Sequence, residues 1–347
     1  MKVGRTLKDI TQNRMFYGVK TGLNEAFIID QMTRDKLVRE DPACTAIIKP
    51  MLRGEDLRPW YQENEGRWLI FTRRGIDIDS YPAVKDYLQQ FREQLEPRTA
   101  DRDSTTSHGR KPGTYKWYEI QDSVDYYNEF DKPKIFWPDI ARFPRFSWDE
   151  RGQFVNNKGY ILSPPDASLL GILQSRVCWF CISRLCAPLG ERLGLMIYQH
   201  FTQFMINLPI PTLTEVQREQ IGTLARQLTD VAQRRYEVRR KTAHRILHDL
   251  GNGLEARLNQ RLELWWDLSF PEFRAEVQRV FKRDIPLKDR DDWEELLRER
   301  ATQIRTLTDE IVRLETLLNA AVYVVFDLND EEIALIERET KYKYGEW

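Results

Sequence analysis

Cysteine is scarce in this chain of 347 residues, which contains four: Cys44, Cys178, Cys181 and Cys186. Four cysteines are too few, and too clustered, for a disulfide scaffold. The last three lie in or just after an apolar run with no histidine close enough in sequence to complete a metal site. We therefore predict buried core thiols, which suit a reducing cytoplasm.

Long apolar runs and net charge are also missing. No apolar stretch approaches the ~20 residues that cross a membrane, and no secretory signal peptide is expected. The formal net charge is -1, so no global basic field attracts nucleic acid. A small basic excess lies before Pro211. Any contact with DNA must therefore come from local clusters of cations.

The motifs of methyl transfer are a third absence. A DNA amino-methyltransferase needs a glycine-rich loop to hold S-adenosylmethionine, and an Asn or Asp followed by two prolines and an aromatic to accept hydrogen bonds from the target amino group. The loop is missing, and the nearest match to the second motif, Ser163-Pro164-Pro165-Asp166, lacks the amide and the aromatic. No acidic set of nuclease type is found, and the four histidines are scattered. We expect no catalytic residues, no cofactor and no metal.

Two prolines in Leu208-Pro209-Ile210-Pro211 divide the chain, because they stiffen it and prevent a helix or strand from continuing. Residues 1–211 predict a mixed α/β domain, with a strand at Trp68–Thr72 and its most apolar helix at Ala167–Cys186. Residues 212–347 predict an all-α domain. The expected fold class is an α/β domain followed by a helical one.

The helical domain is expected to be an antiparallel coiled coil. Thr214 and Gln217 form a capping box, and the helix that follows has the seam Ile221, Leu224, Leu228 and Val231. A second helix, from about 291 to 325, has the longer seam Leu297, Ile304, Leu307, Ile311, Leu314, Leu318 and Ala321. The first seam ends before the charged stretch Arg234–Lys241. We predict that part of the second seam stays open to a partner.

The segment Tyr17–Asp30 predicts a strand, a tight turn and a strand. Two glycines bracket Lys20 and Thr21, so the turn can take conformations closed to larger residues and present a cation and a hydroxyl at its tip. The apolar run Ala26–Ile29 predicts a buried strand behind it. A plain surface turn is the alternative.

A second candidate segment is the turn Arg53–Trp60, in which charges of both signs alternate before Pro59. The mixed signs indicate an internal salt-bridge brace. Such a brace would orient Arg53 and Arg58, whose planar forked donors are suited to recognition. A solvated turn is the alternative.

A third segment, Pro97–Gly113, has almost nothing apolar. Loops of that length are usually functional or disordered, and its cations have no folding reason to be there: Arg98, Arg102, Arg110 and Lys111. Lys116 and Trp117 follow, so the loop ends in aromatics that could stack on a base or anchor the core. Farther along the chain, Arg142 and Arg145 follow a predicted strand.

Several of these blocks together resemble a known family, the TaqI-like specificity domain. That domain is the target-recognition half of adenine-specific DNA methyltransferases and of fused type IIG restriction-modification enzymes. The blocks that match in order are Tyr17–Phe27, Ile48–Arg58, Lys116–Gln121, Lys132–Ile135, Leu169–Trp179 and Leu208–Pro211. The junction at Pro211 is also similar to that of type I specificity subunits. The helical part, with Trp265-Trp266 and Trp293, resembles the C-terminal ends of type IIG and phage-defence (BREX-type) methyltransferases.

The resemblance implies a DNA target-recognition domain at 1–211 and a helical spacer at 212–347 that docks a methyltransferase catalytic subunit, with an endonuclease where the system has one. Duplex DNA would be the other partner. The loop cations Arg98, Arg102, Arg110 and Lys111 would hold phosphates. Base edges would be read from turn tips by Lys20, Arg53, Arg58, Arg142 and Arg145, with Thr21, Lys116 and Trp117 beside them.

The family carries a catalytic methyltransferase region upstream, whereas here Met1 stands almost at the recognition domain. We therefore expect no enzyme activity from this chain alone. Two alternatives stay open: a protein-interaction scaffold from a truncated methyltransferase, and a C-terminal piece of a longer adenine methyltransferase or endonuclease.

Overall fold

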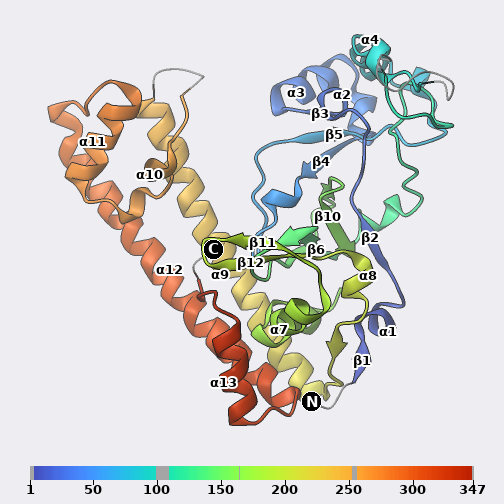
Figure 1. The fold of residues 1–347 in the computed structure, drawn as a ribbon. Helices are drawn as coiled ribbons and strands as arrows, with labels where there is room; N and C mark the ends of the chain where they lie inside the picture. Colours follow the sequence, from blue (N-terminus) through green and yellow to red (C-terminus); the bar gives the residue numbers. More distant parts are fainter. Residues whose placement is uncertain (1–3, 99–108, 164, 252–255, 346–347) are drawn as a thin grey trace.

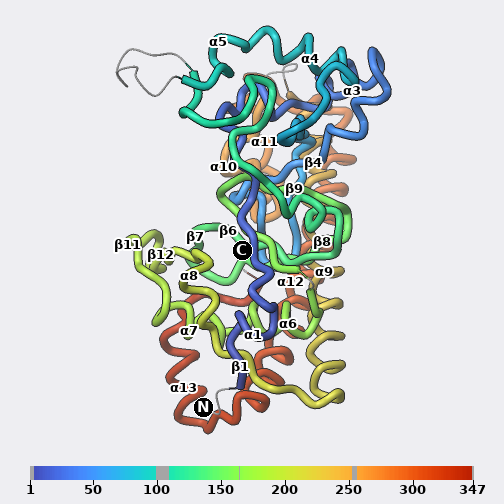
Figure 2. The backbone as a smooth tube through the Cα atoms, turned by 90° about the vertical axis from the view of Figure 1, so that its right-hand side faces the viewer, coloured from blue at the N-terminus to red at the C-terminus, as the bar shows by residue number. Residues whose placement is uncertain are grey.

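The computed structural model describes residues 4–98, 109–163, 165–251 and 256–345. It contains a mixed α/β region followed in the chain by a long helical region (Figure 1). This confirms the expected fold class. Turned by 90°, the chain has α4 and α5 at one end and β1 and α13 at the other (Figure 2).

The described strands form four small sheets. The first is antiparallel, in the order β2 (Met15–Tyr17), β10 (Gly159–Leu162), β6 (Lys134–Pro138) and β8 (Ser147–Asp149). The second has the order β3 (Ile28–Ile29), β5 (Trp68–Ile70), β4 (Ile48–Leu52) and β9 (Phe154–Val155), and only its β4–β9 pair is parallel. The third is β11 (Pro188–Arg192), β12 (Leu195–Gln199) and β7 (Ile140–Ala141). The fourth pairs β1 (Arg5–Thr6) with β13 (Pro209–Ile210).

The helices of the α/β region are short. They are α1 (Leu7–Thr11), α2 (Asn24–Phe27), α3 (Gln31–Glu40), α4 (Pro82–Gln89), α5 (Arg92–Leu95), α6 (Ala167–Gln174), α7 (Arg176–Leu185) and α8 (Thr202–Met205). The helical region has α9 (Glu215–Leu250), α10 (Gln260–Glu263), α11 (Phe270–Phe281), α12 (Arg290–Val325) and α13 (Asp330–Glu339). No helix within the described ranges is long and apolar enough to cross a membrane.

The single apolar helix expected at Ala167–Cys186 is two helices. Ser175 interrupts it in an extended conformation, and its side chain accepts the N–H of Cys178, which caps α7. Serine competes with the helix for backbone hydrogen bonds and so favours this capping position. The expectation of buried core thiols is confirmed, since all four cysteines are free and buried.

The predicted hairpin at Tyr17–Asp30 is wrong. The strand β2 pairs with β10, and β3 pairs with β5 in another sheet. Between them the chain follows the β9–β10 connection, where the N–H of Gly18 donates to Gly159 O and that of Val19 to Val155 O. A Cβ on Gly18 would lie 2.0 Å from Asn156 O, so only glycine allows this approach. These distant partners replace the local turn.

The helical region begins as predicted, with a Thr214–Gln217 capping box on α9. Helices α9 and α12 pack together and run in opposite directions (Figure 1). The expectation that part of the α12 seam stays open is wrong, because Ile304, Leu307, Ile311, Leu314 and Leu318 are at most 4% exposed. The seam of α9 continues past Val231 through Val238, Ile246 and Leu250.

Arg235 explains how that seam crosses the charged stretch. Its side chain is buried, and Nη1 donates to Thr308 Oγ1 and to Gly345 O. Burial lowers the pKa of Arg235 to about 10. A cation thus sits inside the helix pair, with Nη1 bonded to α12 and to the C-terminal segment, so the pairing does not stop at Arg234.

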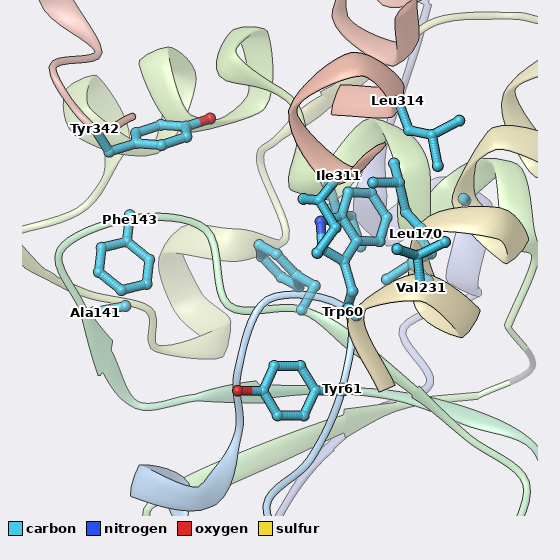
Figure 3. Close-up of a cluster of buried hydrophobic side chains, with 14 of the residues drawn as sticks. Trp60, Tyr61, Ala141, Phe143, Leu170, Val231, Ile311, Leu314 and Tyr342 are labelled. Atoms are coloured by element: carbon cyan, nitrogen blue, oxygen red, sulfur yellow. The ribbon is translucent and has the colours of Figure 1, made fainter. Parts of the chain in front are cut away.

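One hydrophobic core joins the two regions. Figure 3 shows Trp60 and Leu170 of the α/β region meeting Val231 of α9 and Ile311 and Leu314 of α12. A second core lies under the β3–β5–β4–β9 sheet. The division into domains at residue 211 stays a prediction, and the first core crosses it.

Candidate nucleic-acid interface

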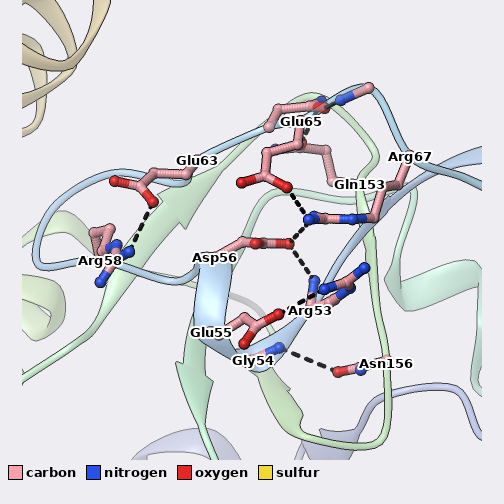
Figure 4. Close-up of polar contacts among 12 residues, drawn as sticks. Arg53, Gly54, Glu55, Asp56, Arg58, Glu63, Glu65, Arg67, Gln153 and Asn156 are labelled. Atoms are coloured by element: carbon pink, nitrogen blue, oxygen red, sulfur yellow. Dashed lines mark hydrogen bonds and ion pairs between the residues drawn. The ribbon is translucent and has the colours of Figure 1, made fainter. Parts of the chain in front are cut away.

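The segment Arg53–Arg67, here called the arginine–carboxylate turn, is a polar cluster that contains the predicted site residues Arg53 and Arg58 (Figure 4). It begins where β4 ends and turns through a short 3-10 helix, Gly54–Asp56. Asp56 is 3% exposed and accepts the backbone N–H of Arg53 at 2.7 Å and Nη1 of Arg67 at 2.8 Å. Burial raises the pKa of Asp56, and these two partners oppose the rise.

The predicted brace is confirmed. Arg53 pairs with Glu55 at 2.7 Å, and Arg58 pairs with Glu63 at 2.8 Å. Arg67, which the sequence interpretation missed, joins Asp56 to Glu65. Charged residues at every second position, Glu63, Glu65 and Arg67, were the signal that could have found it. Carboxylates therefore orient the guanidinium groups of Arg53, Arg58 and Arg67.

The turn is attached to the β9–β10 connection and to helix α12. The N–H of Gly54 donates to Asn156 Oδ1 at 3.1 Å, and a Cβ on Gly54 would lie 2.1 Å from Lys158 O. Trp60 is 1% exposed, has a φ of 74°, and donates Nε1–H to Glu315 Oε1 at 2.9 Å. A positive φ is rare for a bulky residue and costs about 1–3 kcal/mol. Such a conformation persists only where packing fixes it, so the turn is rigid.

Arg145 joins this turn from a distant part of the chain. Its Nε donates to Leu57 O at 2.6 Å and its Nη2 to Glu55 O at 2.8 Å. Burial lowers the pKa of Arg145 to about 10, and the nearby charges of Arg58 and Arg142 act in the same direction. Arg142 is half-buried, over the ring of Phe143. The structure therefore gathers Arg53, Arg58, Arg142 and Arg145 at one place.

The candidates at Lys20 and Thr21 do not form a tip. Thr21 is 1% exposed, its hydroxyl donates to Asn24 Oδ1 at 2.8 Å, and its carbonyl accepts Nη1 of Arg110 at 3.0 Å. Lys20 is half-buried beside it. The expected exposed hydroxyl is wrong, because the backbone here packs against Gln121, whose N–H donates to Thr21 O.

Arg110 is not in a solvated loop, and this corrects its expected role. The side chain is 4% exposed. All five of its N–H donors point to carbonyl oxygens, those of Leu95, Thr21, Glu119, Lys116 and Trp117. Burial lowers the pKa of Arg110 to about 10. No donor is left for a phosphate, so Arg110 is a structural brace.

The other loop candidates lie around that brace. Arg98 donates its N–H and Nε–H to Arg110 O, and Lys111 and Lys116 are exposed. Arg102 lies outside the described residues. Trp117 is half-buried, with Arg92 4.7 Å from its ring centre and Tyr118 edge-on at 5.5 Å. Base contact by Trp117 stays a prediction.

A groove of about 700 Å³ borders the arginine–carboxylate turn at Trp60, Tyr61 and Gln62. It lies between Trp148 and α9, and its rim mixes carboxylates with arginines. Within the described part of the chain, no three His, Cys, Asp or Glu side chains cluster as metal ligands do. Burial raises the pKa of the Cys178, Cys181 and Cys186 thiols, so these are not reactive thiolates.

The chain is similar to several known proteins. Residues 214–322 match DUF8810, a domain of unknown function. The chain is 21% identical over 244 residues to the type II methyltransferase M.BanIII of Aneurinibacillus aneurinilyticus, which covers 64% of this chain and 38% of that protein.

Two solved structures are similar. The type IIL restriction-modification enzyme MmeI, solved in complex with DNA, has 16% identity and a TM-score of 0.51, and the match covers 93% of this chain and 34% of MmeI. The type IIG restriction endonuclease BpuSI has 12% identity and a TM-score of 0.39, covering 92% and 32%. The chain thus spans about a third of MmeI. It is similar in sequence to a type II methyltransferase and similar in fold to a region of a type IIL restriction-modification enzyme.

Proposed function

We propose that this chain recognises duplex DNA for a restriction-modification system. The observation that carries the proposal is the gathering of Arg53, Arg58, Arg142 and Arg145 around one rigid, carboxylate-braced turn. The sequence similarity to M.BanIII and the fold similarity to MmeI, whose structure includes DNA, support it. The TaqI-like specificity domain, type IIG membership and phage defence belong to the same proposal.

Arginine is suited to this task because its planar fork pairs with N7 and O6 of guanine in the major groove. Each good bidentate pair discriminates against a wrong base by about 1–3 kcal/mol. Side chains that are already oriented lose less conformational entropy on binding, since each immobilised side chain otherwise costs about 0.5–1.5 kcal/mol. The turn is therefore better suited to recognising particular bases than to attracting DNA of any sequence.

The carboxylates do not prevent binding. Arg53 is 44% exposed and Glu55 68% exposed, and such surface pairs are worth only about 0–1 kcal/mol. A guanine edge can replace that partner. Arg145 differs, because its two carbonyl contacts leave Nη1 with no hydrogen-bond partner among the described residues. Its Nη1 can donate to a new acceptor while both existing hydrogen bonds are kept.

A catalytic partner is part of the proposal, with a changed location. The α12 seam is buried within this chain, so a methyltransferase subunit would have to dock elsewhere. The methyl transfer named for M.BanIII is not carried over, because the match covers 38% of that protein.

Selection from a randomised duplex pool tests the proposal. We expect a short sequence to be enriched, and its log affinity to fall with log salt at a slope of roughly -4 to -5 if four to six phosphates are contacted. Failure to bind any duplex at low salt would favour the protein-interaction scaffold. Binding without enrichment would leave a DNA-binding protein but refute target recognition.

A further inference from the structure

We propose that Arg239 and Arg240 of α9 hold backbone phosphates of the duplex that the arginine–carboxylate turn contacts. The helical region then forms part of the DNA site and is more than a spacer. The inference rests on the proposed function and adds residues on the far side of Pro211 to the interface.

A ring contact fixes which face of α9 is involved. Tyr236 lies with its ring centre 5.1 Å from that of Tyr61, which belongs to the arginine–carboxylate turn. Residues three and four positions farther along a helix lie on the same face, one turn away. Arg239 and Arg240 occupy those positions, so they stand next to the turn that carries Arg58.

These two arginines differ from their neighbours on α9 in lacking an ion pair within the described part of the chain. Arg234, Lys241 and Arg245 each face a carboxylate on their own helix, at 3.6, 3.9 and 3.3 Å. Arg239 and Arg240 form no ion pair with any described residue.

Their settings also differ from each other. The guanidinium of Arg239 lies 4.7 Å from the ring centre of Trp266, which orients it without neutralising its charge. Arg240 is exposed. Arg239 is thus oriented with its charge intact, and Arg240 is open to solvent; both can meet a phosphate.

The two regions also share one electrostatic environment. Burial, with the charge of Glu63, raises the pKa of Tyr61 to about 12, while the positive charges of Arg239 and Arg58 act in the opposite direction. Charges from α9 and from the turn therefore meet at one ring. Positive charges on two sides of a site attract an anion, and the bound anion reduces the repulsion between them.

The arrangement in space agrees. Figure 1 shows α9 leading from the α/β region to the helical elbow of α10 and α11. Arg239 and Arg240 lie in the second half of α9, on the way to that elbow. A duplex on the arginine–carboxylate turn would therefore have α9 as its neighbour, and its phosphates are the groups that a helix can reach without entering a groove.

The test uses the full chain and a duplex of either selected or random sequence. Changing Arg240→Ala should reduce the salt slope by about 0.9, the value for one phosphate contact, and should weaken both duplexes alike. The double change R239A/R240A should reduce the slope by about 1.8. Arg240→Lys keeps the charge and should restore the slope.

Arg313 of α12 is the matched control, since it is also exposed, helical and without an ion pair in the described chain. Arg313→Ala should leave slope and affinity unchanged. A wild-type slope in the double variant overturns the inference while the proposed function stands. A loss confined to the selected duplex also overturns it, because it would indicate base reading. Absence of DNA binding by the wild type refutes both.

Discussion

Replacement of Arg110 separates a structural role from a DNA contact. The guanidinium is 4% exposed and gives all five N–H donors to carbonyls of Thr21, Leu95 and residues 116–119. Arg110→Ala therefore removes the link between three separate segments. The variant should be destabilised, and any loss of DNA binding should follow from that.

The size of the loss can be worked from those carbonyls. A buried polar group left unsatisfied costs about 1–3 kcal/mol. Thr21 O and Lys116 O keep a backbone N–H donor, from Gln121 and Glu119. The other three carbonyls together cost about 3–9 kcal/mol, which is a large part of the ~5–15 kcal/mol that stabilises a typical fold. With a urea m-value of about 1–3 kcal/mol/M, the midpoint should fall by more than about 1 M.

Urea unfolding followed by circular dichroism measures this loss. Arg110→Lys should not restore stability, because an ammonium has three donors and no planar fork. Lys111→Ala changes the neighbouring exposed cation and should leave the midpoint in place. If Arg110→Ala keeps wild-type stability but weakens binding to every duplex, the brace is refuted and Arg110 returns to the DNA interface.

Three further predictions concern reading, acid stability and the shared core. Arg145→Ala and Arg58→Ala should each cost about 1–3 kcal/mol on a selected duplex and little on a random one in anisotropy titrations, and equal losses on both would make them phosphate contacts. His200 is buried, with neither ring nitrogen hydrogen-bonded in the described chain, and burial lowers its pKa to about 3. Because the unfolded chain takes up this proton near its ordinary pKa of 6.5, stability should fall as pH drops from 6.5 towards 3. His200→Phe should make the melting temperature less dependent on pH in that window. An unchanged pH profile would contradict a role for His200 in acid stability. Leu307→Glu places a charge in the seam and should abolish DNA binding together with helicity, whereas retained DNA binding would show that the α/β region folds independently.

The sequence was informative where local chemistry decides structure. The capping box at Thr214 and the prolines before it place the start of α9. The alternation of charge from Arg53 onward predicts a brace that the ion pairs to Glu55 and Glu63 confirm. In both cases the partners lie within a few residues of one another, so spacing alone carries the information.

It failed where partners are distant. Gly18 and Gly22 suggested a hairpin, yet Gly18 is needed because the backbone of Asn156 passes close by. Arg110 looked solvated because its neighbours in sequence are polar. Its acceptors, however, come from segments before and after it in the chain, such as Leu95 and Glu119. The gathering of Arg145 with Arg58 depends on tertiary contacts that no spacing encodes.

The shared core determines which segments would have to be exchanged together in a chimera of two related proteins. Gly171 of α6 lies so close to α9 that a Cβ there would be 2.7 Å from the Ile221 side chain. Trp60, in the arginine–carboxylate turn, donates a hydrogen bond to Glu315 of α12. A chimera joined at Pro211 would pair one parent's α6 and Trp60 with another parent's helices, and would clash or leave a void. Transplants should therefore carry α9 and α12 with the turn that they support.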